Sequence, residues 1–159
     1  MAQGDIFLKI DGIPGESKDD AHADELDIDS FSWGVSQSGG FGTGAGGGTG
    51  KAALQDITFS AKLSKASPIL MLACASGKHI DSATLTVRKS GEDRQEYYVV
   101  TIEDILVSSY QVGGSDTIPT DTFSFNFAII KFAYKPQKAD GTLDSAVESG
   151  WDQEKNKKT

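Results

Sequence analysis

A glycine-rich segment is the part of this sequence whose residue types come nearest to a catalytic or binding motif. Residues 45–52 read Ala-Gly-Gly-Gly-Thr-Gly-Lys-Ala, which places Lys51 where a phosphate-binding loop carries its lysine. Both ends of the motif are wrong, because Ala45 replaces the first glycine and Ala52 replaces the Ser or Thr that binds Mg²⁺. Residues 56–63 predict a strand, whereas a phosphate-binding loop opens a helix. We therefore expect no nucleotide site and no cofactor.

The histidines and the single cysteine are the next candidates, for a metal site or for nucleophilic catalysis. His22 lies in the acidic run 19–25, which could hold a cation or could be a solvated or capping cluster. Cys74 lies in an apolar segment that predicts a helix, where a thiol is usually inert, and it has no cysteine partner for an ordinary zinc site. His79 follows that helix, where a basic residue complements the helix dipole. We expect no metal site and no catalytic residues, and therefore a protein that is not an enzyme.

Charge and composition disfavour several classes of partner. The 159 residues carry 15 Lys and Arg against 23 Asp and Glu, a net charge of −8, which disfavours nucleic acid. No apolar stretch approaches the roughly 18 residues of a membrane-spanning helix, so we expect no membrane insertion. The N-terminus lacks the basic region of a secretory signal, and one cysteine cannot form an internal disulfide. We expect a chain made in the cytoplasm, whose export must proceed without a cleaved signal peptide.

Alternation of apolar and polar residues predicts a mainly β fold, in one domain that spans residues 1–159. Residues 90–94 predict a turn that joins 85–89 and 95–102 in a hairpin. The apolar positions of the alternating runs are Ile6, Leu8 and Ile10; Phe31, Trp33 and Val35; Ile57, Phe59, Ala61 and Leu63; Ala83, Leu85 and Val87; and Phe123, Phe125, Phe127 and Ile129.

Two of the predicted strands depart from simple alternation. Residues 97–102 are apolar at both parities, and in residues 123–134 the apolar set moves from odd to even positions. A bulge near Ile129–Ile130 would flip the pattern. Alternatively the strand is buried on both faces, which in a small antiparallel domain indicates a neighbouring subunit. Both interpretations stay open.

One helix is predicted, over Pro68–Ser76. Ser67 can cap it, Pro68 suits its first position, and Gly77 suits its end. Its apolar residues surround most of the helix, so we expect it to close one end of a sheet or barrel rather than to lie on an open surface. These residues are Ile69, Leu70, Leu72, Ala73 and Cys74.

Two segments are too polar to predict regular structure. Residues 39–50 have only Phe41 as an apolar anchor, so burial cannot offset the entropy of ordering them. They predict a flexible extended loop within the domain. Residues 137–159 predict a polar tail, anchored by Trp151.

Short motifs occur along the whole chain in a distinctive order. They are Gly-Glu-Ser-Lys-Asp at 15–19 with His22, Ser-Phe-Ser-Trp-Gly at 30–34, the glycine-rich loop, Ala-Cys-Ala-Ser-Gly-Lys-His at 73–79, Val-Ser-Ser at 107–109, Tyr-Lys-Pro-Gln-Lys-Ala-Asp-Gly at 134–141 and Gly-Trp-Asp at 150–152. No one motif is decisive. The ordered set resembles the haemolysin-coregulated protein (Hcp) family, the inner-tube subunit of bacterial type VI secretion systems.

The resemblance implies a compact β-barrel of two packed antiparallel sheets with one short helix at its side. It also implies six subunits that close a ring, rings that stack into a tube inside a contractile sheath, and a spike tip protein on the tube. Small effector proteins would travel in the lumen, and the subunit would reach the extracellular space or a target cell. Two alternatives stay open: a small non-catalytic carbohydrate- or protein-binding β-sandwich module, and the tube protein of another contractile injection device.

Strand parity and the resemblance together suggest two candidate surfaces. If Phe31, Trp33 and Val35 face the core, polar residues occupy the other face of the strand, and the corresponding strand of the family lines the lumen. The candidate lumen residues are Ser30, Ser32 and Ser36. The family's extended loop contacts the adjacent ring, and its candidate residues here are Gly39, Gly40, Phe41, Gly42, Thr43, Gly44, Thr49, Gly50 and Lys51.

Overall fold

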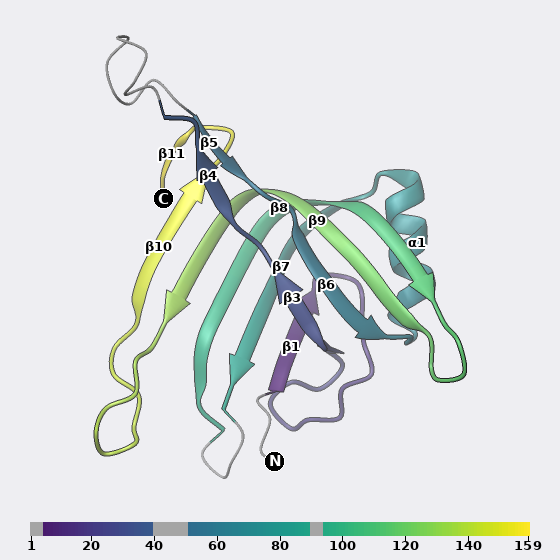
Figure 1. Cartoon of the computed structure of the whole chain (residues 1–159), viewed down its shortest axis with the longest axis horizontal. Coiled ribbons are helices and arrows are strands. Elements are labelled where there is room, and N and C mark those ends of the chain that lie inside the picture. Colours follow the sequence, from purple (N-terminus) through teal and green to yellow (C-terminus); the bar gives the residue numbers. More distant parts are fainter. Residues whose placement is uncertain (1–4, 40–50, 90–93) are drawn as a thin grey trace.

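The computed structural model describes residues 5–39, 51–89 and 94–159. Within these ranges the chain is mainly β with one short helix, as predicted (Figure 1). The elements are β1 (Asp5–Ile10), β2 (Leu26–Asp27), β3 (Ser30–Ser32), β4 (Val35–Gln37), β5 (Ala52–Leu54), β6 (Ile57–Lys62), α1 (Ala66–Ser76), β7 (His79–Arg88), β8 (Glu96–Gly113), β9 (Thr120–Tyr134), β10 (Val147–Asp152) and β11 (Lys157–Lys158).

The strands form one large antiparallel sheet and a separate two-stranded ribbon. β8 and β9 are the longest strands and pair along most of their length, and β7 and β1 follow on the other side of β8. The second edge of β9 is divided, because its first half pairs with β6 and its second half with β10. The ribbon consists of β4 and β5. The predicted hairpin is confirmed as β7 and β8, although residues 90–93 of its turn lie outside the described ranges.

The large sheet coils around the core without closing into a barrel. β2 pairs with β1, and shortly afterwards in the chain β3 pairs with β6. Residues 26–32 therefore cross from β1 to β6, so the hydrogen-bonded ladder does not continue from β2 into β3. Two antiparallel sheets are present, as the resemblance implied, but the closed barrel is not.

Inward side chains of the central strands form a single core. Phe59, Phe123 and Phe125 pack against one another, with ring centroids 5.2 to 5.5 Å apart. Most residues that alternation placed in the core are buried there. The prediction is wrong at Val35 and Leu63, which are 59% and 45% exposed, because the first belongs to the separate ribbon and the second follows the end of β6.

The buried side of the two long strands changes at one level of the sheet. On β9 it changes between Phe127 and Ile130, and on β8 between Ile102 and Ile105. The ladder between the strands keeps its register at these positions, so the bulge predicted in this part of β9 is wrong. Asp104 has a left-handed backbone, with φ of +57°. This conformation redirects the side chains of β8 without adding a residue to the strand.

α1 begins two residues earlier than predicted and buries only one side. Its end is as predicted, since Gly77 adopts a left-handed conformation (φ +67°). Ser67 does not cap the helix but lies in its first turn. Residues on one face are buried, whereas Ile69 and Leu72 are exposed, so the expectation that the helix does not lie on an open surface is wrong. No helix in the described ranges is long and apolar enough to span a bilayer.

The C-terminal residues are built into the sheet. β10 pairs with β9, and β11 pairs with β10, so the segment predicted as a polar tail contains the edge strands. Trp151 packs against the core, as expected. The sequence did not predict these strands, because β10 contains Gly and Glu and has no alternating apolar pattern.

Candidate functional site

The predicted lumen serines lie on the polar face of the sheet. Ser30 and Ser32 are exposed on β3, while Phe31 and Trp33 pack against the core. Trp33 also donates its ring N–H to the hydroxyl oxygen of Tyr98, at 2.7 Å, which fixes the strand to β8. Ser36 is exposed as well, but it lies on the ribbon beyond the end of β3.

Antiparallel pairing extends this polar face across four strands, β3, β6, β9 and β8. One row of directly paired residues runs through Ser30, Ser60, Thr122 and Gln111. The next row runs through Ser32, Thr58, Ser124 and Ser109. We call these eight residues the hydroxyl face. None of them is charged, and all lie opposite the side that buries the phenylalanine cluster.

Sequence reasoning found only two members of this face. The signal for the others was present, because Thr58, Ser60, Thr122 and Ser124 alternate with core residues in their own strands. What the sequence could not give was the register, which aligns these residues with β3 to make one surface.

A hydrogen-bonded network organises one edge of the hydroxyl face. Ser108 donates to Asp56 Oδ2 at 2.6 Å and lies 2.7 Å from the hydroxyl of Ser124. Ser109 lies 2.6 Å from the same hydroxyl. The β8–β9 register shifts between Val107 and Ser109, which gives Ser108 this position. These hydroxyls contact one another and the carboxylate of Asp56, so the arrangement is a hydrogen-bonded network.

Most of the predicted loop residues cannot be placed. Gly39 and Lys51 are exposed at the two ends of the loop. The others, Gly40, Phe41, Gly42, Thr43, Gly44, Thr49 and Gly50, lie outside the described residues. The strands on either side of the loop, β4 and β5, pair with each other, so the loop starts and ends at the tip of the ribbon.

His22 is buried, at 7% exposure, and carboxylates face both of its ring nitrogens. Nδ1 lies 2.9 and 3.0 Å from the two carboxylate oxygens of Glu25, and Nε2 lies 2.6 Å from Oε1 of Glu96. A neutral imidazole can donate only one of these hydrogen bonds. Burial lowers the pKa of His22, but the hydrogen bonds with Glu96 and Glu25 outweigh burial and raise the pKa above the usual 6.5.

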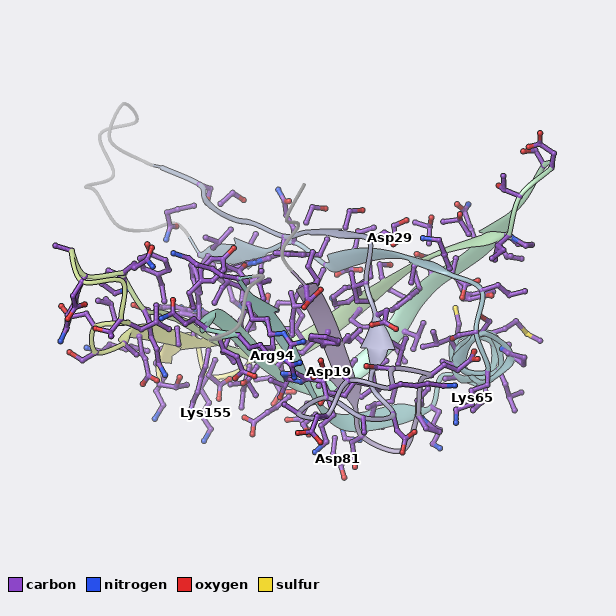
Figure 2. The ribbon with its side chains drawn as sticks, turned by 90° about the horizontal axis from the view of Figure 1, so that it is seen from below. Asp19, Asp29, Lys65, Asp81, Arg94 and Lys155 are labelled. Atoms are coloured by element: carbon purple, nitrogen blue, oxygen red, sulfur yellow. The ribbon has the colours of Figure 1, made fainter. Side chains whose placement is uncertain are left out.

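Arg88 and two aspartates form a second charged group, which lies beside the ring of Phe7. The Nε and Nη2 of Arg88 lie 3.1 Å from Oδ2 of Asp5, and its Nη1 lies 2.9 Å from Oδ2 of Asp19. The hydrogen bond from Arg88 lowers the pKa of Asp19 to about 2. Arg94 adds a weaker attraction, and Figure 2 shows it beside Asp19. His22 stacks on Phe7 at 4.4 Å between ring centroids, and the guanidinium carbon of Arg88 lies 4.8 Å from the centroid of that ring.

These interactions fasten the loop before β2 to the sheet. We call the group the Phe7 clasp: Asp5, Phe7, Asp19, His22, Glu25, Arg88 and Glu96. Its carboxylates form hydrogen bonds with Arg88 and His22. Within the described ranges no group of three or more His, Cys, Asp or Glu side chains could hold a metal ion. Within the acidic run His22 is buried, whereas Asp20 and Asp24 are exposed, so the run combines a buried histidine with carboxylates that face solvent.

A smaller polar cluster fixes α1. Asp121 is buried on β9 and accepts hydrogen bonds from the hydroxyls of Ser67 and of Tyr110, the latter at 2.6 Å. Burial raises the pKa of Tyr110, and the contact with Asp121 raises it further. His79, after the helix, is exposed and lies 3.1 Å from Asp104 Oδ1. The hydrogen bond between Ser67 and Asp121 holds the helix on the sheet.

Solved structures of type VI secretion proteins have the same fold. Hcp1 from Salmonella typhimurium matches with a TM-score of 0.83 and 34% identity, over 100% of both chains. Another solved structure, described as a type six secretion system protein, matches with a TM-score of 0.90 and 28% identity, over 99% of this chain and 100% of that chain. The coiled antiparallel sheet with one side helix is thus the fold of a type VI secretion protein.

Sequence comparison identifies the family. The family described as "Type VI secretion system effector, Hcp" matches residues 7–134. Protein hcp1 from Pseudomonas aeruginosa is 46% identical over 156 residues, which cover 96% of each chain. The chain belongs to the Hcp family, which confirms the resemblance inferred from the ordered motifs.

Proposed function

We propose that this chain is the structural, non-catalytic subunit of a type VI secretion tube. Six copies close a ring, rings stack inside a contractile sheath beneath a spike tip protein, and the hydroxyl face lines the lumen. The observation that carries this proposal is the hydroxyl face itself, an uncharged polar surface that four strands extend across one side of the molecule. Such a wall can form hydrogen bonds with many polar surfaces.

Small effector proteins are the proposed cargo of this lumen. Hydroxyl groups rotate and both donate and accept, so the face can bind different effectors weakly without a shaped pocket. The subunit is made in the bacterial cytoplasm and leaves the cell with the tube, without a cleaved signal peptide. The glycine-rich loop, with Phe41 as its apolar anchor, contacts the next ring.

Substitution of a lumen residue tests the cargo role. Ser32→Trp should leave rings intact in negative-stain images and reduce the amount of effector that copurifies with them. Ser145→Trp is the matched control, because Ser145 is exposed on the loop before β10 and far in sequence from the hydroxyl face. Unchanged retention of several effectors by Ser32→Trp rings would contradict the lumen assignment. A wild-type chain that is monomeric at all concentrations would contradict the tube and favour a β-sandwich binding module.

A further inference from the structure

His22 connects the segment between β1 and β2 to the start of β8. Its Nδ1 lies 2.9 Å from a carboxylate oxygen of Glu25, in its own segment, and its Nε2 lies 2.6 Å from Glu96, 74 residues further along the chain. The ring is buried and stacks on Phe7, which is itself only 3% exposed. Because close packing holds the ring in this plane, it cannot turn away from one carboxylate unless the segment moves with it.

The charge of the ring decides whether both contacts can be kept. An imidazolium donates hydrogen bonds from both nitrogens, whereas a neutral imidazole donates from only one and presents a lone pair at the other. In the neutral form a nitrogen lone pair therefore faces a carboxylate oxygen of Glu25 or of Glu96, with no proton between them. A buried acceptor without a donor is costly, so loss of the proton breaks one of the two contacts in either tautomer.

Two further contacts connect this segment to the rest of the fold. Arg88 donates to Asp19, and this hydrogen bond lowers the pKa of Asp19 to about 2 and raises the pKa of Arg88 above its ordinary value. Glu16 accepts a hydrogen bond from the backbone N–H of Lys65, at 2.8 Å. Histidine ordinarily changes its charge between about pH 5 and 8, so the contact through His22 is the one that responds to pH near neutrality.

The surroundings of His22 favour its protonated form. The charged groups on the elements that pack around the ring are Asp19, Asp20, Asp24 and Glu25 of its own segment, Asp5 and Lys9 of β1, Asp27 of β2, Arg88 of β7, Arg94 before β8, and Glu96 of β8. Carboxylates outnumber cations in this set, and Arg88 is already paired with Asp5 and Asp19. Burial lowers the pKa of His22, but the hydrogen bonds with Glu96 and Glu25 raise it above 6.5.

Residues 15–25 form a unit that can move without disturbing the sheet. Their described backbone hydrogen bonds stay within the segment, since the N–H groups of Gly15, Ser17 and Asp24 all donate to carbonyl oxygens between residues 17 and 25. β1 pairs with β7, and β8 with β9, without any contribution from this segment. Release of the segment therefore breaks no strand pairing.

We propose that His22 is a pH-dependent switch, which holds residues 15–25 on β1, β7 and β8 when it is charged and releases them when it loses its proton. Release uncovers Phe7 and leaves the sheet folded. The inference concerns a single chain and does not depend on the proposed function.

Hydrogen exchange measured over a range of pH tests the switch. Protection factors, which correct for the intrinsic pH dependence of exchange, are compared for residues 15–25 and for the paired strands β8 and β9. Above about pH 6.5 the protection of residues 15–25 should fall by up to about tenfold per pH unit, until the pH passes the folded pKa of His22. At each pH a low concentration of urea should lower the protection of β8 and β9 but not that of residues 15–25, because a local opening exposes little surface.

Glu96→Gln distinguishes the switch from an ordinary stabilising contact. The Gln side chain can donate to the lone pair of a neutral His22 whose Nδ1 donates to Glu25, so both contacts persist without the charge. The fall in protection with pH should therefore largely disappear in this variant. The side chain of Glu96 is 43% exposed, so the variant should fold. The matched control is Asp104→Asn, at the exposed contact with His79, which should behave as the wild type does.

Three results would overturn the switch. The first is protection of residues 15–25 that stays constant with pH in the wild-type chain. The second is a urea dependence of that protection as steep as in β8 and β9, which would make the release a part of global unfolding. The third is a fall in protection with pH in Glu96→Gln as large as in the wild type.

Discussion

The Phe7 clasp and the outer face of α1 differ in which side chains the subunit buries. In the clasp, charged side chains that are costly to bury find opposite charges within the same chain, and Arg88 is only 4% exposed. On α1, large apolar side chains that favour burial remain in solvent. The clasp contributes to the stability of the subunit, whereas the exposed side chains of the helix contribute little to it. The comparison separates residues that stabilise the fold from residues that stay on its surface.

Removal of the clasp's arginine should have the largest effect on folding. Arg88→Met leaves Asp5 and Asp19 without their partner, and we expect a loss of about 3 kcal/mol in the free energy of unfolding, as for other disrupted buried ion pairs. Urea denaturation, at a protein concentration where the chain is monomeric, measures this loss. Lys62→Met is the matched control: Lys62 and Asp29 form an exposed pair at 3.4 Å, whose removal should cost less than about 1 kcal/mol. Equal losses in the two variants would show that the clasp is not a stabilising centre.

The pH dependence of stability should report the histidine of the clasp. Because the folded state raises the pKa of His22, protonation stabilises the fold. This contribution is complete below the unfolded pKa of about 6.5 and is lost as the pH rises through the higher folded value. The urea midpoint should therefore fall as the pH rises above about 6.5, and His22→Gln should reduce the fall. His79→Gln, at an exposed histidine, should keep it. If the urea midpoint of His22→Gln falls by the same amount, groups other than His22 cause the fall.

The smallest effect on stability should come from a substitution on the outer face of α1, where Ile69, Met71 and Leu72 are exposed. Leu72→Ala removes an exposed side chain, so the free energy of unfolding of the monomer should change by less than about 0.5 kcal/mol. The neighbouring Leu70 is fully buried, and Leu70→Ala should cost about 2–5 kcal/mol. Urea denaturation of both variants measures the two losses. A Leu72→Ala chain that loses as much stability as Leu70→Ala would show that the outer face of α1 contributes to the fold of the subunit.

The sequence by itself determined the class of fold, the strands of the core and the absence of recognisable catalytic motifs. Period-two alternation is a local property, so Ala83, Leu85 and Val87 could be placed in the core without knowledge of their partners. The end of α1 at Gly77 could likewise be predicted from the local sequence, because glycine readily adopts the left-handed conformation that ends a helix. The order of short motifs along the whole chain was enough to indicate the family.

Only the tertiary structure decided which residues share a surface. Ser32 joins Thr58, Ser124 and Ser109 because of strand register, which depends on partners far apart in the sequence. Arg88 looked like an ordinary strand residue, and its burial became possible when the fold brought Asp5 and Asp19 to it. The apolar helix was expected to close one end of a sheet or barrel, yet its outer face is exposed. A sequence records which side chains are apolar, but only the packed tertiary structure shows which of them are buried and which stay exposed.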